Sequence, residues 1–351
     1  MRRENAILLL MLLAGSASAQ FTSLTSTGDG SRLYFSSPLR LRGTTQTFDA
    51  KIFRIDDQGP ALFAAQERGE RFGWTWTQFY DLTLPQVSRD GTGVIAYTGV
   101  RDCLGGSGCL NVQRAQGTVV DAAGAVRLRG IGYVNLSRNG RYALFFGRNT
   151  WAGLVPPAEL ADLGTGEHIT LNYRIAPNAA RRVADEGTVA LVDPAGVRLW
   201  TRNREQVIPV TPAASMPGQE PLLLLASDAM RFVYQSAAGL ARFDRMRGTE
   251  EIVTPGAPVS VSISDDAGTI AFVNKEDGQI HVGIPARVLT REPGGFSEVA
   301  LSGDGRVAFG VTNRGRLVRI EVASGTVTEL VPRTPWITNP ALPGVATYLE
   351  D

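Results

Sequence analysis

The sequence predicts an all-β protein, a β-propeller built from seven four-stranded blades. A short polar turn that opens into an alternating apolar strand recurs seven times along the chain. The acidic or Asn position of this turn aligns at Asp29, Asp90, Asn139, Asp185, Asp228, Asp266 and Asp304. Successive copies lie 38 to 61 residues apart, and a period near 40 residues in β-type sequence is typical of propeller blades. Six or eight blades are the alternatives, because the sixth copy is irregular.

The first 19 residues have the pattern of a secretory signal peptide. Arg2 and Arg3 precede an apolar run over residues 6–14, and Ala17-Ser18-Ala19 supplies a small-residue cleavage site. A transmembrane helix is the alternative, but the run is shorter than the roughly 20 residues that span a bilayer. We therefore expect cleavage after Ala19, export to the periplasm or the cell exterior, and no membrane insertion of the mature chain.

Charge argues against nucleic acid as a partner. The expected mature chain carries 33 basic and 33 acidic residues, so it has no long-range attraction for nucleic acid or anionic lipid. Composition does not change between residues 20 and 331, which predicts one closed ring and a monomer. The tail, residues 332–351, contains four prolines and is expected to pack under the ring or to lead toward a further domain.

The last repeat, residues 296–331, contains a whole blade. Strands are predicted at 296–301, 307–311, 317–322 and 327–331, separated by turns at 303–305, 313–315 and 324–325. Asp304-Gly305 between alternating strands is a strong hairpin signal, because Gly accepts the positive φ of a tight turn. Earlier repeats show the same third and fourth strands in degraded form. In the sixth, Pro285 predicts an edge strand or a bulge, since Pro cannot donate to a ladder.

These motifs resemble the propeller repeats of the periplasmic TolB protein and the related WD-like repeats of secreted bacterial proteins. The clearest matches are Ser302-Gly303-Asp304-Gly305 followed by Ser324-Gly325, and the stretch DLGTGE at residues 162–167. The resemblance extends over about residues 21–331 and implies a β-propeller. It departs from the pattern at Ala229, where Gly is missing. No counterpart of the α/β domain of TolB is visible, so the partners of TolB are not implied.

Two cysteines, Cys103 and Cys109, enclose a glycine-rich loop in the longest insertion. In an exported chain we expect them to form a disulfide. The alternative, a metal or redox site, lacks a second pair of ligands and has no nearby His.

No catalytic, metal or cofactor residue is predicted. His168 and His281 are the only histidines, each lies in a predicted strand, and neither adjoins a nucleophile motif. A calcium ring formed by the repeated Asp residues is the alternative. One Asp per hairpin instead indicates a carboxylate that binds its own turn.

Aromatic residues are concentrated between Phe72 and Tyr80. The alternation of Phe72, Trp74 and Trp76 predicts one strand face, packed between blades or exposed as a platform for sugar or peptide. The candidate ligand contacts are Trp74, Trp76, Phe79 and Tyr80. The insertions around residues 66–87, 100–110 and 147–158 are expected to gather in one sector of the ring.

The predicted function is that of a non-catalytic scaffold that binds a protein or a glycan. A hydrolase or lyase with its site in the central channel is the alternative, and a structural spacer is a third possibility. The polar side chains that point into the channel distinguish an enzyme from a scaffold.

Overall fold

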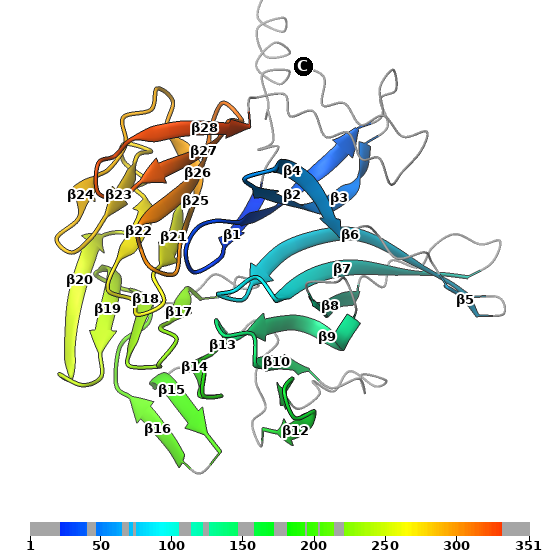
Figure 1. Ribbon diagram of the computed structural model, residues 1–351. Coiled ribbons are helices and arrows are strands. Elements are labelled where there is room, and N and C mark those ends of the chain that lie inside the picture. The colour runs from blue at the N-terminus through cyan, green and yellow to red at the C-terminus, as the bar shows by residue number, and fades with distance from the viewer. Residues whose placement is uncertain are drawn as a thin grey trace, which may run out of the picture.

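Six β-sheets are arranged around a central channel in the computed structural model (Figure 1). The structure describes residues 22–40, 47–64, 70–72, 75–104, 114–121, 126–146, 158–171, 181–193, 195–202, 204–213 and 221–331. Within these residues the chain forms 28 strands, and no helix in them could cross a membrane. The chain therefore has the all-β propeller fold that the repeat pattern predicts.

Five of the sheets have four antiparallel strands each, in sequence order from the channel outward. The first sheet consists of β1 (Thr22–Ser26), β2 (Leu33–Arg40), β3 (Thr47–Asp56) and β4 (Gly59–Ala64). The next consists of β13 (Arg181–Val183), β14 (Val189–Asp193), β15 (Gly196–Thr201) and β16 (Arg204–Ile208). It is followed by β17 (Leu223–Leu225), β18 (Arg231–Ser236), β19 (Gly239–Asp244) and β20 (Thr249–Pro255).

The last two sheets complete the ring. One consists of β21 (Ser260–Ile263), β22 (Ile270–Val273), β23 (Ile280–Val282) and β24 (Arg287–Val288). The other consists of β25 (Phe296–Leu301), β26 (Val307–Thr312), β27 (Leu317–Glu321) and β28 (Val327–Val331), at the boundaries predicted to within one residue. Pro285 lies in the turn between β23 and β24, so the predicted edge strand or bulge at this proline is wrong.

The second and third predicted repeats share one eight-stranded sheet, so the structure has six blades and the prediction of seven is wrong. Its first four strands are β5 (Glu70–Phe72), β6 (Thr75–Val87), β7 (Gly93–Leu104) and β8 (Arg114–Asp121). The other four are β9 (Val126–Leu136), β10 (Tyr142–Phe146), β11 (Ala158–Asp162) and β12 (Glu167–Thr170). The merger arises because the long β9 pairs with β8 along one edge and with β10 along the other.

The hydrophobic core lies between neighbouring sheets. One cluster combines Ala271 and Ile280 of β22 and β23 with Leu301 and Ala308 of the following sheet. The ring closes in the same way, because Phe35 and Phe53 of the first sheet pack in one cluster with Phe309 and Leu317 of the last. Within the described residues no strand of the last sheet pairs with the first. Side-chain packing and hydrogen bonds, such as that from the Asp304 N–H to the Gly28 carbonyl at 2.7 Å, therefore join the two ends of the ring.

Two predicted segments lie outside the described residues, namely the signal peptide at 1–19 and the tail at 332–351. Two of the predicted insertions are described in part, as the outer halves of β6 and β7. These two strands project from the ring as a paired ribbon as far as the pair Thr75 and Leu104 (Figure 1). The third insertion lies almost entirely outside the described residues.

Candidate functional site

Seven inner-hairpin turns surround one mouth of the channel, and we call them the turn ring. They consist of residues 27–30, 88–91, 137–140, 184–187, 226–229, 264–267 and 302–305. In the last turn the Ser302 hydroxyl donates to Asp304 Oδ1 at 2.6 Å, and the same oxygen accepts the Arg306 N–H at 3.0 Å. The turns at Ser88 and Ser264 repeat both bonds. The repeated Asp residues therefore bind their own turns, as the structural interpretation predicts.

The fourth turn corrects the sequence alignment by one residue. Ala184 occupies the position of the repeated Ser or Thr, since the Gly187 N–H donates to its carbonyl, as Gly305 does to Ser302. Glu186 therefore takes the acidic position, and Asp185 takes the variable second position. The substitution of Ala for Ser hides this register in the sequence.

Hydrogen bonds between neighbouring turns close the turn ring. Each turn has four residues, numbered here 1 to 4. In most neighbouring pairs the backbone N–H of residue 2 or 3 of one turn donates to the backbone carbonyl of residue 2 of the next turn. These bonds include Gly28 to Arg89 at 2.7 Å, Asp185 to Ser227 at 2.8 Å, Ser227 to Asp265 at 2.6 Å, Asp265 to Gly303 at 2.7 Å and Asp304 to Gly28 at 2.7 Å. Arg89 donates in the same way to Arg138, and Asn139 reaches Asp185 through N–H to Oδ1 and Nδ2 to O bonds.

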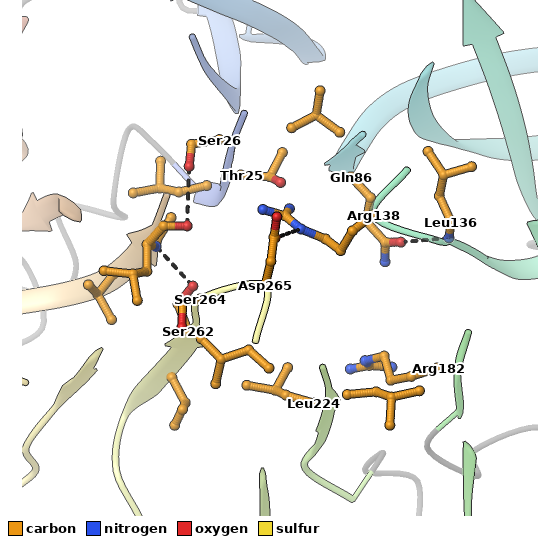
Figure 2. A pocket seen from close by; sticks show the side chains of 18 of the residues that line it. Thr25, Ser26, Gln86, Leu136, Arg138, Arg182, Leu224, Ser262, Ser264 and Asp265 are labelled. Carbon is orange, nitrogen blue, oxygen red and sulfur yellow. Dashed lines mark hydrogen bonds and ion pairs between the residues drawn. The ribbon is translucent and has the colours of Figure 1, made fainter. Parts of the chain in front are cut away.

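Side chains at the second turn position form an ion-pair cluster across the channel mouth. Arg89 donates through Nε to Asp265 Oδ2 at 2.5 Å and through Nη2 to Asp185 Oδ2 at 3.3 Å. Arg138 Nε donates to Asp265 Oδ1 at 2.6 Å (Figure 2). Ser227 Oγ lies 3.3 Å from Arg89 Nη2. Since Arg89 comes from the second turn and its partners from the fourth, fifth and sixth, it bridges the mouth.

Burial and charge shift two pKa values in this cluster. Burial acts to lower the pKa of Arg89, but the hydrogen bond and the charge of Asp265 outweigh it, so the pKa is raised. Burial raises the pKa of Asp185 above its ordinary value, although the Asn139 amide and Arg89 oppose the shift. Both carboxylates of the cluster pair with Arg89.

Below the cluster, the channel contains a cavity of about 290 Å³. Its wall is made by the innermost strands β1, β6, β9, β13, β17, β21 and β25. Gln86, Asn135, Arg182, Ser260, Ser262 and Glu298 line it as polar residues, interspersed with apolar ones such as Leu224 and Val261. The channel is thus a polar cavity with a bridged mouth.

Most acceptors on this wall bind the backbone of the next innermost strand. Such a strand has one edge without a partner strand, so alternate N–H groups on it need an acceptor. Ser262 Oγ accepts the Leu301 N–H at 2.9 Å, and Glu298 Oε1 accepts the Leu24 N–H at 2.6 Å. Gln86 Oε1 accepts the Leu136 N–H at 3.2 Å (Figure 2). The channel acceptors therefore serve as caps for strand edges.

Some donors on the wall are not committed in this way. Arg138 Nη2 is buried and has no hydrogen-bond partner within the part of the chain that the structure describes. Gln86 makes its capping bond to Leu136 through the amide oxygen, so the amide nitrogen takes no part in that cap. The wall therefore carries hydrogen-bond donors, Arg138 Nη2 and Gln86 Nε2, that the strand-edge caps do not use.

The predicted ligand contacts lie partly within the described chain. Trp76, Phe79 and Tyr80 lie on β6 in the projecting ribbon, where they pair with Cys103, Val100 and Gly99. Trp74 lies outside the described residues. Phe72 ends β5 and pairs with Thr75 of the antiparallel β6, so Phe72 and Trp76 lie on two different strands and not on one as predicted. Because Cys109 is also outside the described residues, the disulfide stays a prediction.

Both histidines lie away from the channel. His281 on β23 stacks on Phe272 and has Nε2 2.9 Å from Asp277 Oδ2. His168 on β12 has Nδ1 3.6 Å from Glu159 Oε2 and contacts the edge of Phe145. Among the residues that the structure describes, no group of three or more His, Cys, Asp or Glu side chains is placed to hold a metal ion.

Sequence reasoning missed the residues that define the channel. Arg89, Arg138 and Asp265 occupy the second position of the turn, which varies most between repeats, whereas the sequence prediction rests on the repeated residues. Gln86 and Arg182 lie two residues before the first residue of their turns and are equivalent to Ser262. Aligning the repeats and reading the variable positions would have found both sets.

Comparisons with known proteins agree with the fold. No protein-family model and no curated protein matches the sequence. The β-propeller domain of the trilobed protease from Pyrococcus furiosus, whose topology is described as open velcro, superposes with a TM-score of 0.59. The two are 12% identical over 90% of this chain and 98% of that one. The chain is a β-propeller.

An oligogalacturonate lyase in complex with manganese is also similar. It superposes with a TM-score of 0.52 at 13% identity, over 82% of this propeller and 84% of the lyase chain. At this identity the similarity shows the fold alone. Both an enzyme and a domain of a larger protein are therefore built on this architecture.

Proposed function

We propose that this propeller is an exported, monomeric scaffold that binds a protein or a glycan and carries out no reaction. The observation that supports it is the use of the channel acceptors. Asp185 and Asp265 are paired with arginines, and Glu298 holds the Leu24 N–H. A general base must reach a proton on the substrate with an acceptor that is free to take it. All three carboxylates already bind donors that belong to other residues of the propeller.

The channel enzyme, a hydrolase or lyase, is the competing function. It requires carboxylates, His or Arg from several blades to converge on a substrate. Arg138 and Arg182 both line the cavity, but the described histidines lie on outer strands. Arginine alone stabilises charge and does not accept a proton. The arrangement thus favours binding over proton transfer.

We place the partner-binding surface on the ribbon of β5, β6 and β7. The ribbon projects from the ring (Figure 1), and β6 carries three of the four candidate aromatic residues. Aromatic rings provide large and rigid contact areas for sugars and peptides. A disulfide between Cys103 and Cys109 would fix the end of β7 next to Trp76, its partner in the ladder.

The test is binding of the mature chain to a panel of neutral and acidic polysaccharides and to cell-envelope proteins. Trp76→Ala should weaken binding at least tenfold and leave the melting temperature unchanged. Trp200→Ala is the matched control, because Trp200 packs against a core cluster and its loss should lower stability. Unfolding of Trp76→Ala would place this ring in the core, and release of cleaved saccharide would identify an enzyme. Either result would contradict the proposal.

A further inference from the structure

One wall of the channel cavity is rich in donors. Gln86 and Arg182 come from β6 and β13, and Arg138 comes from the turn after β9, the innermost strand between them. Arg138 uses Nε for Asp265, which leaves its buried Nη2 without an acceptor among the described residues. Arg182 contacts Asn135 Oδ1 through a long bond of 3.4 Å. Two guanidinium groups and a primary amide thus line neighbouring parts of the cavity wall.

The facing wall has a different character. It presents the side chains of Thr25, Ser262 and Glu298 beside those of Leu224, Val261 and Ala300, and Glu298 Oε1 accepts the Leu24 N–H at 2.6 Å. Such a surface accommodates a short carbon chain and one or two hydroxyl groups. The two walls together favour a molecule that is anionic at one end and largely apolar at the other.

Size and access limit the ligand further. The cavity volume, about 290 Å³, is at the lower end of the range for small-molecule sites. Arg89 bridges the turn mouth through Asp185 and Asp265. The bridge favours a small molecule that enters through the opposite mouth over a polymer threaded through the ring.

We infer that the central cavity binds a small organic carboxylate, whose oxygens accept hydrogen bonds from Arg138, Arg182 and Gln86. Guanidinium groups match the planar geometry of a carboxylate and bind it with charge-assisted hydrogen bonds. A buried donor without an acceptor is unfavourable, and a bound carboxylate beside Arg138 relieves this after a small rotation of the guanidinium. The inference rests on the proposed function in that the ligand is bound and released unchanged.

Calorimetric titration with butanoate tests this site. Butanoate, which has one carboxylate and a short apolar chain, should bind with one-to-one stoichiometry, while butanamide, its uncharged analogue, should not bind. Arg182→Met should weaken butanoate binding at least tenfold. Arg202→Met is the control, because Arg202 pairs with Glu167 at the outer edge of the ring, and its affinity should equal that of the wild type.

A second variant keeps the test decisive if Arg182→Met does not fold. Leu224→Trp fills the cavity from the apolar wall without changing a charge, and it should also weaken binding at least tenfold. Wild-type affinity in either folded variant, or equal binding of butanamide, would overturn the inference. Displacement of butanoate by equimolar sulfate or phosphate would also overturn it, by showing a general anion site. Conversion of butanoate to a product, detected by NMR, would instead contradict the proposed function.

Discussion

The two arcs of the ring contribute opposite charges to the channel mouth. The merged sheet, β5 to β12, supplies Arg89 and Arg138, and the regular sheets β13 to β24 supply Asp185 and Asp265. The turns also differ in backbone, since Gly91 and Gly140 take positive φ in the first arc, whereas Ala229 and Ala267 do so in two of the three turns of the second. The irregular arc is thus tied to the regular one across the channel by charge. Ion pairs between side chains at the variable second position of the turns, and not the repeated Asp and Gly residues, therefore connect the two arcs across the channel.

Removing the shared carboxylate should have the largest effect. Asp265→Ala leaves Arg138 and Arg89 without their common partner, and its own side chain is only 14% exposed. Loss of one partner from a buried ion pair lowers the free energy of unfolding by several kcal/mol. Because Arg89 is half exposed and solvent weakens its ion pair, we expect a smaller decrease of about 2 kcal/mol. The free energy of unfolding from urea titration measures it.

A double-mutant cycle with Arg89→Met then isolates the link between the arcs. The two changes should be non-additive, because the residues are in direct contact. Asp57→Ala, an exposed turn carboxylate, is the control and should leave stability unchanged. Additive effects within error would show that the arcs are not coupled through this pair.

Substitution of the positive-φ residue at the end of a turn should have the next largest effect on stability. Gly91 has a φ of +76°, and an added Cβ would lie 3.0 Å from Arg32 Nη1 and 3.3 Å from Thr27 Cγ2. Gly91→Ala should therefore cost about 1–2 kcal/mol, the usual penalty for an L-residue in this region. Ala229 has a φ of 56°, so Ala229→Gly relieves the same strain. The change also raises the conformational entropy of the unfolded chain and removes a buried methyl group. The net change in the free energy of unfolding should therefore be within about 0.5 kcal/mol.

Urea titration of both variants measures the difference. Gly166→Ala is the control for the backbone alone, since it has a φ of +75° with no atom near the added Cβ. A loss at Ala229→Gly as large as that at Gly91→Ala would show that the alanine methyl contributes to packing in the regular arc.

Acid should have the smallest and most gradual effect. Hydrogen bonds from Arg141 lower the pKa of Asp162 to about 2, and the Ser264 hydroxyl lowers that of Asp266. A carboxylate with a lowered pKa stabilises the fold above its ordinary pKa near 4 and loses this contribution as the pH falls through the folded value. We therefore expect constant stability from pH 7 to about 4 and a decline toward pH 2.

Asp162→Asn should make that decline shallower in a series of urea titrations between pH 6 and pH 2.5. Asp185 acts in the opposite direction, since burial raises its pKa and its ionised form is the less favourable one. An identical decline in wild type and variant would rule out Asp162 as a source of the acid sensitivity.

The sequence predicted the repeats better than the way they assemble. Asp304, Gly305 and the alternating strands around them form local turns and hairpins, so their structure follows from neighbouring residues. The merger of two repeats depends on pairing between β8 and β9, which no short-range signal shows. The cluster around Asp265 joins residues 89, 138, 185 and 265. Contacts over such separations depend on ring geometry, which the sequence does not reveal locally.

The backbone caps in the channel also bear on how the chain avoids aggregation. Each innermost strand would otherwise present free N–H groups, and an exposed edge of this kind is a template on which another chain can add a strand. Ser262, Gln86 and Glu298 occupy N–H groups on the neighbouring strands. Before the ring closes these edges are open to other molecules, so loss of the caps should lower the yield of refolding at high protein concentration more than the stability of the folded ring.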